Sequence, residues 1–149
     1  MKFSTRSHYG LRAMISLARS YDGGSVALSD VARAEGISLG YLEQLAASLR
    51  KAGLVSSQRG SHGGYHLVRA PAKVTVGQVV RALEGPLSLV DCVSESGHSG
   101  SCQHETGCPS RVLWERMRDA LDQVLDSTTL ADLCHQPEAQ PAIAAGPGH

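Results

Sequence analysis

Three cysteines lie close together in one polar, glycine-containing segment of the chain, residues 91–110, with the sequence DCVSESGHSGSCQHETGCPS. They are Cys92, Cys102 and Cys108. Thiolate sulfur is a soft ligand that suits zinc, copper(I) and iron–sulfur clusters. Because this segment has almost nothing apolar to bury, we interpret the three cysteines as ligands of a metal centre and not as incidental loop residues.

The spacing Cys-x9-Cys-x5-Cys is wider than the tight Cys-x2–4-Cys knuckles of structural zinc sites. Longer spacers can enclose the larger body of an iron–sulfur cluster. Pro109 places Cys108 at the start of a predicted helix, where peptide dipoles favour a thiolate and free backbone N–H groups can bond cluster sulfides. His98 and His104 fit a ligand or a solvated loop residue. Cys134 is predicted to be a half-buried core residue.

The elements that must position this segment begin in a basic half of the chain. The formal net charge of the 149 residues is zero, but residues 1–70 hold nine basic and four acidic residues. A positive N-terminal half can attract phosphate, which favours a DNA partner. No apolar run approaches the roughly 18 residues that span a bilayer. The polar N-terminus has no signal-peptide core, so we expect no membrane partner and a cytoplasmic location, where thiols stay reduced.

Two short helices joined by a tight turn follow a broadly apolar helix predicted over about 7–21. The first of the pair is predicted over 29–35, and the second over 39–52 with Ser38 as its N-cap. One face of the second helix is polar, as in the recognition helix of a helix-turn-helix. Its opposite face carries three leucines at helical spacing, which we assign to the core: Leu42, Leu45 and Leu49.

Two predicted strands, 55–59 and 65–68, flank the glycine-rich loop GSHGG. A β-hairpin after a helix-turn-helix predicts a winged helix. Arg59 and His62 lie at the tip of this wing, where they could reach phosphate or a narrow minor groove, although Arg59 also fits an ordinary solvated charge. We therefore expect a mainly α fold, a winged helix-turn-helix with a three-helix core and a β-hairpin wing.

The C-terminal half is predicted to hold two longer helices. Thr75 and Gln78 form a capping box at the start of the first, and Pro109 begins the second. The second has an apolar seam that suits packing against a second copy or, alternatively, against its own domain; we favour a homodimer because helix-turn-helix proteins commonly read two half-sites. The seam residues are Leu113, Met117, Leu121 and Val124.

Four segments are predicted. They are a DNA-binding domain over 1–85, a cysteine-rich cluster-binding loop over 86–109, a dimerisation helix over 110–134 and a disordered tail over 135–149. The chain has no Cys-x-x-Cys dithiol, phosphate loop or Ser/His/Asp arrangement, so we do not expect an enzyme.

Several strings in the chain resemble the Rrf-type family of winged-helix transcription regulators, in particular its IscR-type iron–sulfur cluster regulators. They are GISLGYLEQLAASLRKAGLVSSQRG with GGYHL, VTVGQVVRALEG, the three-cysteine loop and TTLADL. The resemblance covers roughly residues 1–134. It implies a homodimeric transcription regulator that binds double-stranded DNA and acts as a repressor. The signal it senses would be cluster status, iron, or redox state and nitric oxide.

The same resemblance implies roles for particular residues. Cys92, Cys102 and Cys108 would be the thiolate ligands of a cluster, for which it favours [2Fe–2S] over [4Fe–4S]. Arg59 would reach the minor groove from the wing. Four residues of the recognition helix would lie at or near bases and phosphates: Ser38, Tyr41, Glu43 and Gln44.

The chain departs from the family pattern at two places. The first spacer, VSESGHSGS, is longer than in IscR-type regulators. Arg111 stands where those regulators have a ligand histidine, and a guanidinium cannot ligate because it stays protonated. His8, at a position from which a nitric-oxide-sensing branch supplies a carboxylate, and His104 are candidate fourth ligands, with a thiol or water from solution as further alternatives. A zinc-stabilised winged-helix regulator or interaction module without a cluster is the alternative function.

Overall fold

The computed structural model describes residues 3–61, 63–90, 93–94 and 108–135. Its elements, with η marking 3₁₀ helices, are α1 (Thr5–Arg19), η1 (Tyr21–Gly23), α2 (Leu28–Glu35), α3 (Leu39–Lys51), β1 (Val55–Gln58), β2 (Gly64–Leu67), η2 (Pro71–Lys73), α4 (Val76–Glu84), β3 (Ser88–Val90), β4 (Val93–Ser94), α5 (Pro109–Ser127) and α6 (Leu130–Cys134).

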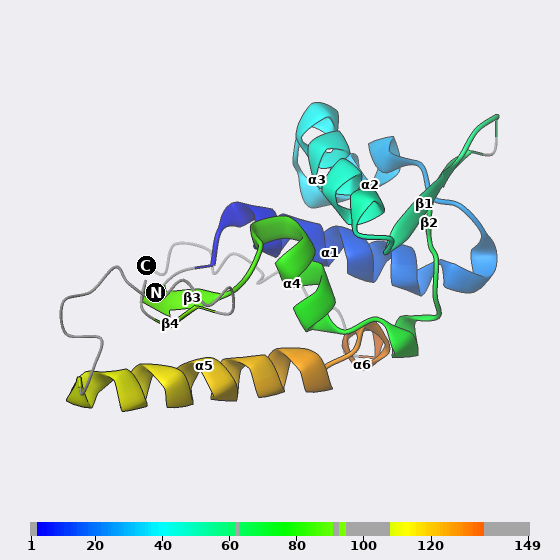
Figure 1. Ribbon diagram of the computed structural model, residues 1–149. Helices are drawn as coiled ribbons and strands as arrows, with labels where there is room; N and C mark the ends of the chain where they lie inside the picture. Colours follow the sequence, from blue (N-terminus) through cyan, green and yellow to red (C-terminus); the bar gives the residue numbers. More distant parts are fainter. Residues whose placement is uncertain (1–2, 62, 91–92, 95–107, 136–149) are drawn as a thin grey trace, which may run out of the picture.

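α1 lies at the centre of the N-terminal part of the molecule. α2 and α3 pack on one side of it, and α4 and α6 pack on the other (Figure 1). α5 runs along the far side of α4, away from α2, α3 and the wing (Figure 1). The fold is therefore mainly helical, as predicted, and places the recognition helix and the long C-terminal helix on opposite sides of α1.

The turn between α2 and α3 depends on Gly36 and Ser38. Gly36 ends α2 at φ 68° and ψ 30°, a left-handed conformation that glycine adopts without a Cβ clash. Ser38 begins α3, and its Oγ accepts a hydrogen bond of 3.1 Å from the Tyr41 backbone N–H. The predicted helix-turn-helix is confirmed. Both helices begin and end within one residue of the positions that were expected from the sequence.

The wing is an antiparallel hairpin whose register runs from Val55↔Leu67 to Gln58↔Gly64. Val26 extends it on the other edge of β2. The Val26 N–H donates to the Tyr65 carbonyl and the Tyr65 N–H donates to the Val26 carbonyl, both at 2.8 Å. These bonds attach the base of the hairpin to the segment before α2, and the hairpin projects away from the helices (Figure 1). The predicted wing is confirmed.

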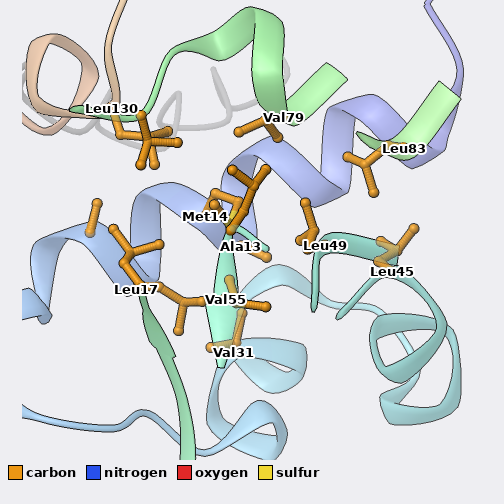
Figure 2. Close-up of a cluster of buried hydrophobic side chains, with 14 of the residues drawn as sticks. Ala13, Met14, Leu17, Val31, Leu45, Leu49, Val55, Val79, Leu83 and Leu130 are labelled. Atoms are coloured by element: carbon orange, nitrogen blue, oxygen red, sulfur yellow. The ribbon is translucent and has the colours of Figure 1, made fainter. Parts of the chain in front are cut away.

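One apolar core joins the N-terminal helices to the C-terminal part of the chain. Met14 of α1, Leu45 of α3, Val79 of α4 and Leu130 of α6 all belong to it and have no exposed side-chain surface (Figure 2). Each such side chain contributes about 1.5–3 kcal/mol on burial, which short helices need because their own propensity is too weak. The leucines assigned to this core from α3 are all buried: Leu42, Leu45 and Leu49.

The segment assigned to dimerisation, 110–134, forms a long helix and a last short helix, as the TTLADL string predicts, and the two have different environments. α5 contains no buried residue, whereas α6 begins with the fully buried Leu130. A capping box between Thr129 and Asp132 starts α6. The short hairpin of β3 and β4, which lies within the predicted cysteine loop, was not expected from the sequence. The predicted tail lies outside the described residues apart from His135.

Candidate DNA-binding face and cysteine site

The exposed face of α3 carries three of the six side chains predicted to contact DNA. Ser38, Glu43 and Gln44 are all exposed, and Arg50 and Lys51 lie exposed in the last two positions of the helix. Hydroxyl, carboxylate and amide groups can read base edges, and the two cations can bind phosphate. The structure therefore brings three of the four predicted α3 residues to one exposed helix.

Tyr41 is placed differently from these three residues. Its ring lies edge-on to Tyr9 of α1, with 6.4 Å between the ring centroids. Its hydroxyl oxygen is buried and has no hydrogen-bond partner among the residues that the structure describes. The ring thus packs α3 against α1, while the backbone N–H closes the Ser38 cap. A contact between Tyr41 and DNA stays a prediction.

The wing presents Arg59 to solvent, directly after β1. His62 lies outside the described residues. Along the hairpin the Ser25 hydroxyl donates to Gln58 Oε1, at the end of β1, at 2.9 Å and lies 3.3 Å from His66 Nδ1 of β2. These contacts join β1 and β2 to the segment before α2, so that the exposed Arg59 stands on an anchored hairpin.

Arg6 is a residue of this region that the sequence analysis missed. Its Nε donates to the Leu83 carbonyl at 3.1 Å, and its Nη2 donates to Ser48 Oγ at 3.3 Å. Arg6 therefore links the start of α1 to the recognition helix and to the end of α4. No spacing pattern in the sequence signals this, because all three residues are far apart along the chain.

Cys108 is the predicted cluster ligand that the structure describes. It lies at the N-cap position of α5, and its Sγ is 3.1 Å from Ser110 Oγ. Hydrogen bonding from the Ser110 hydroxyl, together with the backbone N–H groups of Ser110 and Arg111, holds the pKa of the Cys108 thiol below its usual value. This environment favours a thiolate, the form in which cysteine binds metal.

Most of the other candidate ligands lie outside the part of the chain that the structure describes. Cys92, Cys102, His98 and His104 lie outside the described residues. Within the described ranges, no three His, Cys, Asp or Glu side chains form a group that could hold a metal ion. His8 is exposed on α1, with its ring edge-on to Tyr9 at a centroid distance of 5.1 Å.

Arg111 forms an ion pair within α5, and Cys134 is half-buried at the end of α6. Arg111 Nε donates to Glu115 Oε1 at 2.9 Å, so an ion pair occupies the side chain at the position where a histidine ligand was expected. Cys134 is half-buried, as predicted. Its thiol donates to the Ile15 carbonyl at 3.9 Å, and burial raises its pKa.

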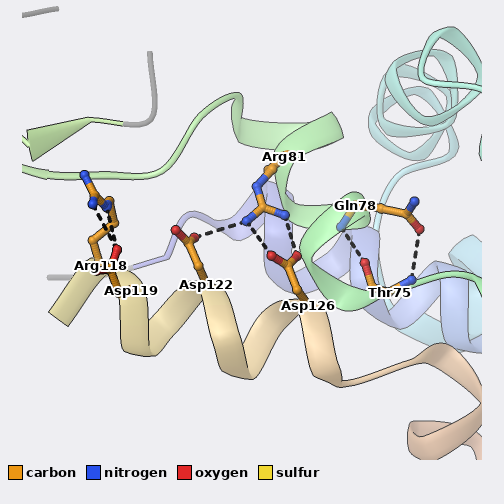
Figure 3. A network of polar contacts seen from close by, with 7 residues as sticks. All are labelled: Thr75, Gln78, Arg81, Arg118, Asp119, Asp122 and Asp126. Atoms are coloured by element: carbon orange, nitrogen blue, oxygen red, sulfur yellow. Dashed lines mark hydrogen bonds and ion pairs between the residues drawn. The ribbon is translucent and has the colours of Figure 1, made fainter. Parts of the chain in front are cut away.

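α5 carries an exposed apolar face and a separate polar face. Of the predicted seam, Leu113, Met117 and Val124 are exposed, and Leu121 is partly exposed. On the side that faces α4, Asp122 and Asp126 bind Arg81 of that helix (Figure 3). The sequence analysis missed this polar contact, although the four-residue spacing of the two aspartates places them on one helix face.

The anchored wing, the helix-turn-helix and the exposed polar face of α3 define a winged-helix DNA-binding transcription regulator. Residues 3–136 match the model of the Rrf2 family, described as an iron-dependent transcriptional regulator. The chain belongs to this family, whose members are regulators of transcription and not enzymes. None of the described helices is long and apolar enough to cross a membrane.

Two curated relatives are transcriptional regulators that match most of the chain. The chain is 44% identical over 133 residues to the transcriptional regulator CymR of Bacillus subtilis, covering 89% of each chain. It is 37% identical over 140 residues to IscR of Aliivibrio salmonicida, covering 94% of this chain and 81% of that one.

The solved structures agree. CymR, described as the global cysteine regulator of B. subtilis, superposes with a TM-score of 0.77 at 44% identity, covering 90% of this chain and 96% of that one. IscR of T. potens superposes with a TM-score of 0.73 at 41% identity, covering 89% and 85%. These similarities support the winged-helix regulator fold.

Proposed function

We propose that the chain is a homodimeric, DNA-binding repressor whose operator occupancy depends on an iron–sulfur cluster held by Cys92, Cys102 and Cys108. It would act in the cytoplasm, where thiols stay reduced. The observation that carries this proposal is the thiolate-favouring position of Cys108 at the start of α5, in a family described as iron-dependent.

The recognition surface is α3 together with the wing. Ser38 and Gln44 would contact bases and phosphates of the major groove, and Arg59 would enter the minor groove. Glu43 would act mainly in specificity, because a carboxylate accepts from cytosine N4 and is repelled by phosphate, so that it penalises wrong sites. His62, at the wing tip, would add a phosphate contact.

Two copies would meet through α5. Its seam residues are exposed in the single chain, with Val124 61% and Leu113 51% exposed, and α5 buries no residue of its own. An apolar seam with a spacing of four, four and three residues along a long helix is typical of helix pairing. A homodimer would cover this seam and present two recognition helices to two half-sites.

The described ligand fits a cluster in its chemistry. The Cys108 thiol is free, partly exposed and biased toward the thiolate by Ser110. A cluster supplies iron that reacts with oxygen or nitric oxide and is lost when iron is scarce. With Arg111 bound to Glu115, His8 or His104 would be the fourth ligand. The resemblance to IscR favours [2Fe–2S].

The cluster would act by population shift. Cys108 adjoins α5, and α5 contacts α4, which packs against α1 and α3. If one arrangement of these helices binds the cluster a few kcal/mol more favourably than another, occupancy of DNA changes by orders of magnitude.

A second candidate is a cluster-free regulator that responds to cysteine supply. The similarity to CymR, described as the global cysteine regulator, favours it. A zinc-stabilised cysteine loop is a related alternative, against which the wide cysteine spacing argues.

The decisive experiment is the absorption spectrum of anaerobically purified protein, with iron, sulfide and zinc measured on the same sample. We expect a coloured protein with matched iron and sulfide, bleached by air or nitric oxide, and a colourless but folded Cys102→Ala variant. Cys134→Ala is the matched control and should keep the colour. Colourless wild-type protein would refute the cluster, and zinc in it would support the structural alternative.

A further inference from the structure

α5 is attached to the DNA-reading part of the chain at its C-terminal end. The Val76 N–H donates to the Thr128 carbonyl at 2.8 Å, and the Leu130 N–H donates to the Val74 carbonyl at 2.9 Å. Leu130 itself is fully buried in the core. These contacts fix the position of this end of α5 but leave its direction to be set elsewhere, because a single attachment point acts as a pivot.

Arg81 supplies a second attachment, farther along the helix. Its Nη1 donates to Asp126 Oδ1 at 2.6 Å, and its Nη2 donates to Asp122 Oδ1 at 3.1 Å and Asp126 Oδ2 at 3.3 Å (Figure 3). The guanidinium thus bridges two successive turns of α5 from a partly buried position. The planar guanidinium donates in fixed directions, whereas a single point charge does not constrain the direction of its partner. This contact can therefore fix the angle between α4 and α5.

Gly77 leaves the room that this contact needs. It lies one turn before Arg81 on α4, and a Cβ added there would collide with Asp126 Oδ1 and lie 2.6 Å from Arg81 Nη1. The lack of a side chain at Gly77 thus allows the carboxylate of Asp126 and the guanidinium of Arg81 to approach α4 closely.

The aspartates lie on the side of α5 opposite the exposed seam. At 100° per residue, Asp122 and Asp126 lie well over 90° around the helix from Met117, the middle of the seam. One side of α5 therefore contacts α4, β3 and β4 contact the helix as well, and the exposed seam residues are left for a second copy: Leu113, Met117 and Val124. At about 1.5 Å per residue, Pro109 lies roughly 28 Å from the pivot at Thr128, so a tilt of about 10° would move that end by roughly 5 Å.

We propose that Arg81, with Asp122 and Asp126, sets the angle between the DNA-reading part and α5 and thereby selects the spacing of the two operator half-sites. This rests on the proposed homodimer that binds DNA. In such a dimer α5 is shared with the partner, so the angle at the α4–α5 contact determines how far apart the two α3 helices lie. Arg81 is a positioning residue and does not itself contact DNA.

The test measures spacing preference and not affinity alone. Duplexes with two half-sites are selected from a randomised library by the wild-type protein, and one base pair is then inserted or deleted between the half-sites. Dissociation constants are measured for wild type, Arg81→Met, Asp122→Asn/Asp126→Asn and the combined variant. Lys73→Met is the matched control, since it removes one exposed positive charge from η2, next to α4.

Wild type and Lys73→Met should prefer the selected spacing by about tenfold or more, a change within the range of a single coupled interaction. The Arg81 and aspartate variants should keep a preference of only about two- to threefold, and the combined variant should match either alone because the residues act as one unit. Gly77→Ala keeps every charge but places a Cβ against Asp126 Oδ1 and Arg81 Nη1, so that both side chains must shift, and it should reduce the preference in the same direction. It tests the proposal even if Arg81→Met folds poorly.

Unchanged spacing preference in Arg81→Met and Gly77→Ala would overturn the inference while leaving the proposed function intact. Equal weakening on every spacing, with a lower melting temperature, would assign Arg81 a merely structural role and also overturn it. A wild-type protein that is monomeric, or that selects no DNA with two half-sites, would refute the proposed function itself.

Discussion

Glu84 shows how a few hydrogen bonds determine the ionisation of one side chain. Burial alone would raise its pKa, but hydrogen bonds from the Ser4 hydroxyl and the Ser4 backbone N–H, together with the charge of Arg6, hold its pKa below the usual value of 4.5. A carboxyl with a lowered pKa in the folded state stabilises the fold above its unfolded pKa. That stabilisation is lost as the pH falls through the folded value.

We therefore expect Glu84→Gln to lower the melting temperature by the same amount at pH 7 and at about pH 5.5, and by less below the ordinary pKa of 4.5. Thermal unfolding followed by circular dichroism across this range checks it. Asp30→Asn, on the exposed surface of α2, is the control. A difference that persists unchanged at pH 3 would contradict the role given to the Ser4 hydrogen bonds.

Arg59 is the exposed cation of the wing, so its contribution should appear in DNA binding and not in stability. We expect Arg59→Ala to weaken binding to a selected operator by about 1–3 kcal/mol if it reads a base or groove shape. Arg59→Lys keeps the charge but not the planar fork, and should recover binding only if the contact is to phosphate. Fluorescence anisotropy titrations measure both. Operator affinity equal to wild type in Arg59→Ala would exclude it from the interface.

For single residues, the sequence predicted helix N-caps better than it predicted the direction in which a side chain points. Ser38 was identified as an N-cap from its residue type and position, and it caps α3. Tyr41 was assigned to the polar face of the same helix, yet its ring lies against Tyr9. An amphipathic tyrosine fits either side of a helix, and the choice is made by a residue of another helix that periodicity does not identify.

α6 depends on the core for its stability. It spans Leu130–Cys134, too short to be stable by itself, and its first residue is fully buried. We expect Leu130→Ala to lower the free energy of unfolding by about 2–5 kcal/mol, because it leaves a cavity in the core where α6 packs against α1 and η2. Urea unfolding measures this.

Leu133→Ala is the matched control for this prediction, because Leu133 is only partly buried in the same helix. It should cost less than half as much. Equal losses in the two variants would mean that α6 as a whole, and not the buried Leu130 side chain, carries the effect.

Among the helices and strands, the sequence predicted those that begin with a capping residue and are long enough to show a periodic apolar face. The capping box of Thr75 and Gln78 and the valine face of α4 were identified and are present. β3 and β4 were missed because strands of three and two residues are too short to show alternation. The burial of α6 was also missed, since five residues do not show which neighbour they will pack against.

At the scale of the whole molecule, the exposed seam of α5 is the largest feature that a single copy leaves unexplained. We expect Met117→Asp to dissociate the proposed dimer, because a charge in the middle of an apolar interface is strongly unfavourable. Sedimentation velocity over a range of concentrations measures this.

The control is Val112→Asp. Val112 is more exposed than Met117, at 60% against 39%, but by helical periodicity it lies off the seam. The same change of an apolar residue to an acid should therefore leave the dimer intact. A dimeric Met117→Asp protein would place the interface elsewhere.

The seam could be predicted from the sequence because it depends only on spacing within one helix. The angle of α5 could not, because it depends on Arg81 and Asp122, which are 41 residues apart. The cysteine site was predicted from residue type, spacing and family resemblance, and of its three cysteines only Cys108 lies among the described residues.

The position of Leu130 has a consequence for how the protein is made. α1, α2, α3 and the wing leave the ribosome first, but Leu130, whose side chain completes their shared core, is synthesised after all of them. Folding of the DNA-reading part is therefore completed only when nearly all of the described chain has emerged, unlike a domain that folds as soon as it is translated. A product truncated before residue 130 would lack both this core residue and the final turn that anchors α5. Such a product would therefore lack the stability that burial of Leu130 gives the finished chain.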